Sequence, residues 1–139
     1  MTRPAQILVL ALIGATLAAL AIDQHLKQAP AVVRRVWVMR SFSPNGDSAR
    51  DRALIRFMVT RRDVVAVTIR DSGGHVVRHL AADRAVRPSR KLRFYWDGRT
   101  DAGRLAPPGT YRVRVTLRRR HRTVDLLREI RLSARPART

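Results

Sequence analysis

Hydrophobic and polar residues follow two different periods along this chain, and the change between them falls near residue 32. Residues 7–22 read ILVLALIGATLAALAI, an apolar run without a charge that Asp23 ends. This run predicts an N-terminal helix close to the length that crosses a bilayer. From Val32 onwards, apolar residues alternate with polar ones, which is typical of β-strands.

Short alternating runs fill the rest of the chain. In KLRFYW the apolar residues Leu92, Phe94 and Trp96 share one side, and TYRVRVTLRRR gives the longest clean alternation, which indicates a strand with one buried face. We expect TVDLLREIRL to return as the hairpin partner of that strand, and AADRAVRPSRK to form a loop between two sheets. The other predicted strands are VVRRVWVMR, ALIRFMVT, VVAVTIRD and HVVRHL.

About seven short strands with turn residues between them, and no amphipathic helix after residue 32, predict an all-β fold. We expect an antiparallel β-sandwich of the immunoglobulin or fibronectin III type, preceded by one N-terminal transmembrane or signal helix. The predicted divisions are residues 1–22 for the anchor or signal peptide, 23–31 for a linker, 32–133 for the sandwich and 134–139 for a disordered tail.

The N-terminal run has two interpretations, an uncleaved anchor and a cleaved signal peptide. Ala19-Leu20-Ala21 has the A-x-A form of a cleavage site. An anchor is favoured because Gly14 and Thr16 are tolerated in membrane helices and the apolar run does not stop before that site. Both interpretations place the rest of the chain outside the cytoplasm.

The net charge of +19 comes from 29 basic and 10 acidic residues, and only Lys27 and Lys91 among the basic residues are lysines. Arginine bias in the coding sequence and selection for an anionic partner both explain this composition. The predicted anion-binding face follows the last hairpin, where no aromatic residues are interleaved for base stacking. Its members are Arg112, Arg114, Arg118, Arg119, Arg120 and Arg122.

The stretch FSPNGDSARD, residues 42–51, is either a turn or a metal loop. Asn45-Gly46 is a strong turn signal because both residues accept positive φ, and Pro44 fixes the backbone before it. In a turn, Asp47 would accept backbone N–H groups of the residues that follow. In a metal loop, oxygens of Asn45, Asp47 and Asp51 would bind calcium. An EF-hand loop needs more oxygen ligands than these three side chains supply. We interpret the stretch as structural and expect no metal.

A second turn-rich stretch, WDGRTDAGRLAPPGTY, runs from Trp96 to Tyr111. Asp97-Gly98 is a tight turn, and Gly109 follows two prolines before the next strand. Asp97 and Asp101 are expected to accept the backbone N–H groups of this loop, which is a structural role.

Catalytic motifs are missing from the sequence. The chain has no cysteine, no serine in a nucleophile elbow and no glycine-rich phosphate loop. His75 and His79, if both lie on a strand, would be roughly 13 Å apart and too distant to share a metal. We therefore expect neither enzymatic activity nor a cofactor.

The ordered motifs FSPNGDSARD, IRDSGGHVVRHL and WDGRTDAGRLAPPGTYRVRV resemble the immunoglobulin-like domain of flagellar hook-capping proteins, the FlgD type, also found in secreted bacterial surface proteins. The resemblance implies a β-sandwich that acts as a spacer or assembly module without catalysis. Ser48 stands where family members usually have glycine. The positions that carry the resemblance, with structural roles, are Phe42, Pro44, Asn45, Gly46, Asp47, Asp51, Trp96, Asp97, Gly98, Gly109 and Tyr111.

The sequence thus predicts a membrane-tethered, extracytoplasmic module of the bacterial envelope that is not an enzyme. The membrane would hold it through Ile7 to Ile22, and anionic lipid headgroups or envelope polymers would meet its basic face. One alternative is a secreted, signal-cleaved adhesive or assembly module that works through protein contacts. A DNA-binding envelope protein is the third hypothesis.

Overall fold

The computed structural model describes residues 3–27, 32–46 and 50–134. The chain divides into two compact units, Met1–Ala31 and Val32–Thr139. The first unit contains one helix, and the second contains all the described strands. The elements are α1 (Arg3–Lys27), β1 (Val33–Val38), β2 (Ser41–Phe42), β3 (Ala53–Val59), β4 (Asp63–Arg70), β5 (Val76–Val86), β6 (Lys91–Trp96), β7 (Gly109–Leu117), β8 (Arg122–Asp125) and β9 (Ile130–Leu132).

Helix α1 is apolar on every side. Its segment Arg3–Ala21 has a mean hydropathy of 2.0, is long and apolar enough to cross a membrane, and contains no buried residue. The Thr16 hydroxyl donates to the Leu12 carbonyl at 2.8 Å, so this polar group is satisfied within the helix. The helix continues to Lys27, so the first five residues of the predicted linker 23–31 are helical, and residues 28–31 lie outside the described parts.

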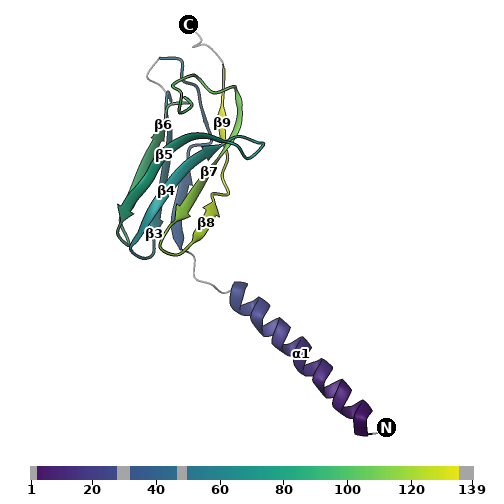
Figure 1. The fold of residues 1–139 in the computed structure, drawn as a ribbon. Helices are drawn as coiled ribbons and strands as arrows, with labels where there is room; N and C mark the ends of the chain where they lie inside the picture. Colours follow the sequence, from purple (N-terminus) through teal and green to yellow (C-terminus); the bar gives the residue numbers. More distant parts are fainter. Residues whose placement is uncertain (1–2, 28–31, 47–49, 135–139) are drawn as a thin grey trace. The chain divides into compact units, whose positions relative to one another are not determined.

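The strands of the second unit form two layers, which confirms the predicted sandwich (Figure 1). One sheet has three strands in the order β1-β3-β6, and the other has the order β2-β9-β7-β4-β5, with β8 also paired to β7. The predicted alternation of buried and exposed residues is present in the strands. Strand β6 buries every second residue, and β7 buries Tyr111, Val113, Val115 and Leu117. Nearly all pairs are antiparallel, but β2 and β9 are parallel.

Two strand predictions were wrong in part. The expected loop at AADRAV is instead the second half of β5, which is eleven residues long. Pairing with β4 holds this half, through Val67↔Ala81 and Asp63↔Val86, and register shifts along the ladder accommodate a strand whose residues are mostly exposed. The expected final strand is broken after Asp125, and β8 and β9 pair in turn with the same edge of β7.

The core of the sandwich centres on Trp96, which is 1% exposed. Its ring lies 5.3 Å from the ring of Phe42 and 4.9 Å from that of Tyr111, centroid to centroid. Trp96 comes from the three-stranded sheet and the other two rings from the six-stranded sheet, so these contacts join the two layers. Tilted and edge-on aromatic pairs at these distances add to the stability gained by burial.

We predict that residues 32–139 fold without the helix. Every described core residue lies between Val32 and Leu132, and the helix belongs to a separate compact unit. Removing residues 1–31 should therefore leave the thermal unfolding midpoint nearly unchanged from that of the full chain in detergent, as measured by circular dichroism. A large drop in the midpoint would contradict this independence.

Candidate functional site

The first of the two turn-rich motifs, around Asn45, is a turn closed by a carboxylate. Oδ1 of Asp51 accepts the backbone N–H groups of Asn45 and Gly46, each at 3.1 Å. Gly46 has φ of +79°, a left-handed conformation that suits glycine. Asp51 thus closes this turn from its C-terminal side. The role predicted for Asp47 stays a prediction, because Asp47 and Ser48 lie outside the described residues.

The second family motif, from Trp96 to Tyr111, is held by its own side chains. The indole N–H of Trp96 donates to the Arg99 carbonyl at 2.9 Å, and Oδ1 of Asp97 accepts the Arg99 N–H at 3.0 Å. At the far end, the Tyr111 hydroxyl donates to the Pro107 carbonyl. This last bond is the tyrosine corner of Ig-like sandwiches, and burial raises the pKa of Tyr111.

Gly98 is the point where the two motifs touch. It has φ of +78°, and a Cβ built there would lie 3.1 Å from Leu132 Cδ1 and 3.1 Å from Pro44 Cγ. The Phe42 ring would be next, at 3.4 Å. A Cβ at this position would require Pro44 and Leu132 to shift by a few tenths of an ångström, so glycine favours the close packing of the second motif against the first.

Asp101 binds a neighbouring strand instead of its own loop. Its Oδ1 accepts the His79 backbone N–H at 2.9 Å, and its Oδ2 lies 2.6 Å from Nδ1 of His79. The hydrogen bond from the His79 backbone, followed by that from the ring, holds the pKa of Asp101 below its ordinary value. Asp101 therefore ties the second motif to edge strand β5.

A second Asp–His pair lies at the start of β5. Oδ1 of Asp71 accepts the His75 backbone N–H at 2.9 Å, which lowers the pKa of Asp71. His75 and His79 thus pair with separate aspartates, and within the described ranges no three His, Cys, Asp or Glu residues could hold a metal ion. Asp71, His75 and Asp101 line an open hollow of about 750 Å³. Ser72 lines it too, but among the described residues its hydroxyl makes no hydrogen bond to either imidazole.

The predicted arginine face is largely neutralised by acidic partners. Arg112 binds Glu129 with Nη2 at 2.7 Å and Nε at 2.9 Å. Arg114 binds Asp125 through two nitrogens, which lowers the pKa of Asp125 and raises that of Arg114. Arg118 pairs with Asp83. These residues lie together on β7 and its neighbours, but much of their charge is already matched.

Arg119 and Arg120 converge on Asp63, a residue that the sequence analysis missed. Asp63 is 1% exposed, and its Oδ1 accepts the N–H groups of Val64 at 2.7 Å and Arg119 at 2.9 Å. Nε of Arg120 lies 3.5 Å from its other oxygen. Asp63 thus anchors the turn between β7 and β8, while Arg122 on β8 is exposed. No local motif in RRDVV distinguishes this aspartate from a loop residue.

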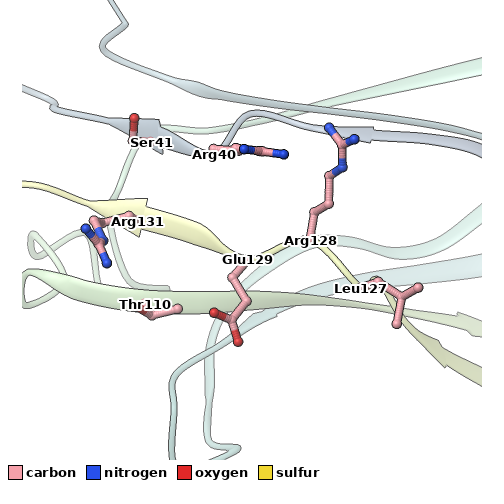
Figure 2. Close-up of a pocket in the computed structure, with 7 residues that line it drawn as sticks. All are labelled: Arg40, Ser41, Thr110, Leu127, Arg128, Glu129 and Arg131. Carbon is pink, nitrogen blue, oxygen red and sulfur yellow. The ribbon is translucent and has the colours of Figure 1, made fainter.

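A further concavity, shown in Figure 2, lies beside β2 and β9. It has a volume of about 460 Å³, and its wall includes Arg40, Arg128 and Arg131. In Figure 2 the guanidinium groups of Arg40 and Arg128 point toward each other, whereas the Glu129 carboxylate, which binds Arg112, points away from them. The hollow is open and cationic, and its charge suits a small anion.

Gly98→Ala should destabilise the sandwich more than Gly103→Ala does. Both glycines have φ of +78°, but only Gly98 has atoms close to an added Cβ. The backbone strain common to both should cost about 1–2 kcal/mol, and the clash with Pro44 and Leu132 should add roughly 1–3 kcal/mol. Urea unfolding of residues 32–139 measures the difference. Equal losses in the two variants would show that the two motifs do not touch at Gly98.

Asp101→Asn should remove part of the acid sensitivity of folding. Because the folded pKa of Asp101 is lowered, the unfolded chain binds its proton more readily, so the stability it contributes is present above pH of about 4 and is lost as the pH falls further. The unfolding midpoints of the wild type and this variant should converge at acidic pH. His79→Ala keeps the backbone donor and should retain much of the dependence. A difference between the unfolding midpoints of the wild type and Asp101→Asn that does not change with pH would contradict this role of Asp101.

Comparison with known proteins gives the family. The family model of the FlgD Ig-like domain matches residues 50–120, about half of the 139-residue chain. Among solved structures, dimeric latent PorU from Porphyromonas gingivalis matches with a TM-score of 0.55 and 18% identity. This match covers 77% of the chain but only 10% of PorU, so it shows the fold alone. No curated protein matches the chain. From its matched sequence and its fold, this chain belongs to the FlgD Ig-like domain family.

Proposed function

We propose that this protein is a non-enzymatic Ig-like module that α1 tethers to a membrane of the bacterial envelope, with the sandwich on the extracytoplasmic side. The observation that supports this most is the exposed apolar surface of α1. Leu8 and Leu12 are each 71% exposed, and no residue of the apolar segment is classed as buried. Such a surface is unfavourable in water and favourable in lipid.

An interaction or structural role for the sandwich is supported by how its polar groups are used. Among the family-motif residues, Asp51 and Asp97 bind backbone N–H groups, and the Tyr111 hydroxyl binds a backbone carbonyl. These hydrogen bonds stabilise the loops. Among the family-motif residues that the structure describes, no nucleophile is paired with a general base. The module would then act by presenting its surfaces to partners, and its positive charge favours anionic ones.

The alternative is a secreted module from which a signal peptide has been removed. Ala19 and Ala21 supply the small residues that a signal peptidase requires. In that case the sandwich would work through protein contacts away from the membrane. The two hypotheses differ in the mass and location of the mature protein.

The test is expression of the full chain with a C-terminal epitope tag in a bacterium, followed by membrane fractionation and mass spectrometry. We expect the mature protein to keep residues 7–22, to resist extraction by alkaline carbonate and to be digested by protease added to spheroplasts. The double variant Ala19→Leu and Ala21→Leu is the matched control. Apart from the mass added by the two substitutions, its mass and its location should be those of the unmodified chain.

A mature protein in the soluble fraction that begins after Ala21 would contradict the tether. The control variant should then accumulate as a larger, membrane-bound precursor. Protection of the tag in spheroplasts, with protein still in the membrane, would place the sandwich in the cytoplasm and contradict the proposed side.

A further inference from the structure

The outer face of the three-stranded sheet carries a set of side chains that the sequence analysis did not connect. Cross-strand pairing places Trp37 opposite Arg56, and Arg56 opposite Arg93, in one row across all three strands. The neighbouring rows pair Leu54 with Tyr95 and Met58 with Lys91. We call this surface the β1-β3-β6 outer face, and its members are Arg34, Arg35, Trp37, Leu54, Arg56, Met58, Lys91, Arg93 and Tyr95.

This face has positive charge that no acidic residue balances. Strands β1, β3 and β6 contain five cationic residues and no aspartate or glutamate. Among the described residues, none of these five takes part in an ion pair, whereas Arg112 and Arg114 on β7 are paired with acids. The sheet opposite the predicted arginine face therefore carries positive charge that no ion pair among the described residues neutralises.

Aromatic and aliphatic side chains lie among these cations. Trp37 is 36% exposed and Tyr95 is 53% exposed, and the guanidinium carbon of Arg56 lies 4.6 Å from the centre of the Trp37 ring. A β-bulge between Arg34 and Trp37, with Arg35 at φ of +51°, brings Arg35 to a shallow hollow of about 220 Å³ shared with Lys91. Tryptophan and tyrosine beside arginine and lysine are typical of surfaces that sit at lipid headgroups.

We infer that the β1-β3-β6 outer face binds the surface of an anionic phospholipid bilayer. Its cations would contact headgroup phosphates, and Trp37 and Tyr95 would enter the interfacial region. This inference rests on the proposed tether, because residues 28–32 alone separate α1 from β1. Five extended residues span at most about 18 Å, so a helix that stays in the bilayer keeps the first strand of this face near it.

Single-stranded nucleic acid also binds protein surfaces on which cations lie beside aromatic rings. Its binding sites combine a groove that follows the backbone with rings free for successive bases to stack on. Here one side of the Trp37 ring is covered by Arg56, and Tyr95 is on β6 with β3 between it and β1. The arrangement favours a broad, evenly charged surface such as a bilayer.

The test uses the fluorescence of the full chain in lipid nanodiscs. The chain has two tryptophans, and Trp96 is 1% exposed in the core, so the difference between the wild type and Trp37→Phe reports Trp37. In nanodiscs that contain phosphatidylglycerol, the Trp37 signal should shift to shorter wavelength and be quenched by brominated lipid at least twofold more than in phosphatidylcholine alone. High salt should abolish this difference, since it screens surface charge.

Two variants with equal charge loss locate the binding face. Lys91→Gln with Arg93→Gln should reduce the quenching of Trp37 by at least half. Arg99→Gln with Arg104→Gln removes two exposed arginines of the second motif, outside this face, and should leave the quenching unchanged. Similar effects from the two variants would overturn the inference, because they would show a response to net charge alone.

Equal quenching of Trp37 in both kinds of nanodisc would also overturn the inference. Quenching of Trp37 by a single-stranded oligonucleotide, without a response to phosphatidylglycerol, would also overturn it and would indicate nucleic acid as the partner. These results are independent of cleavage in the cell because the nanodiscs contain the intact chain. Failure of the tether in the fractionation experiment is therefore distinguishable from failure of this face.

Discussion

The contact of Trp96 with Phe42 and Tyr111 is the interaction on which the rest of the sandwich depends. These rings come from both sheets, so they fix how the two layers face each other. Gly98, two residues after Trp96, allows the second loop to close against Pro44 without steric conflict. The motifs that carry the family resemblance are therefore parts of one packing unit, and their polar groups serve the backbone turns that keep it in place.

The distribution of acidic residues decides where the charge of this very basic protein is available. Asp63, Asp125 and Glu129 pair with arginines of β7 and the turn that follows it. The exposed pairs of Asp125 and Glu129 contribute little to stability, but together with the buried Asp63 they reduce the local positive potential. The three-stranded sheet has no such partners, so an arginine-rich sequence produces two sheets with different electrostatic character.

Alternation of apolar and polar residues was enough to predict strands β3, β4, β6 and β7, because each has one face in the core. It failed for the second half of β5, where an edge strand is mostly exposed and its pairing with β4 determines its structure. Asp63 and the row from Trp37 to Arg93 could not be predicted either. Each depends on the pairing register between strands that are distant in sequence. Periodicity within one strand gives no information about that register.

A tether changes what a weak surface can do. Once α1 is in a bilayer, contact between the sandwich and the headgroups is intramolecular, and a short connection gives it a high effective concentration. A few exposed cations and two aromatic side chains would then be sufficient to select an orientation. If the β1-β3-β6 outer face is held at the membrane, the six-stranded sheet, with the ion pairs of Arg112 and Arg114 and the hollow beside Arg40 and Arg128, is the surface left for other partners.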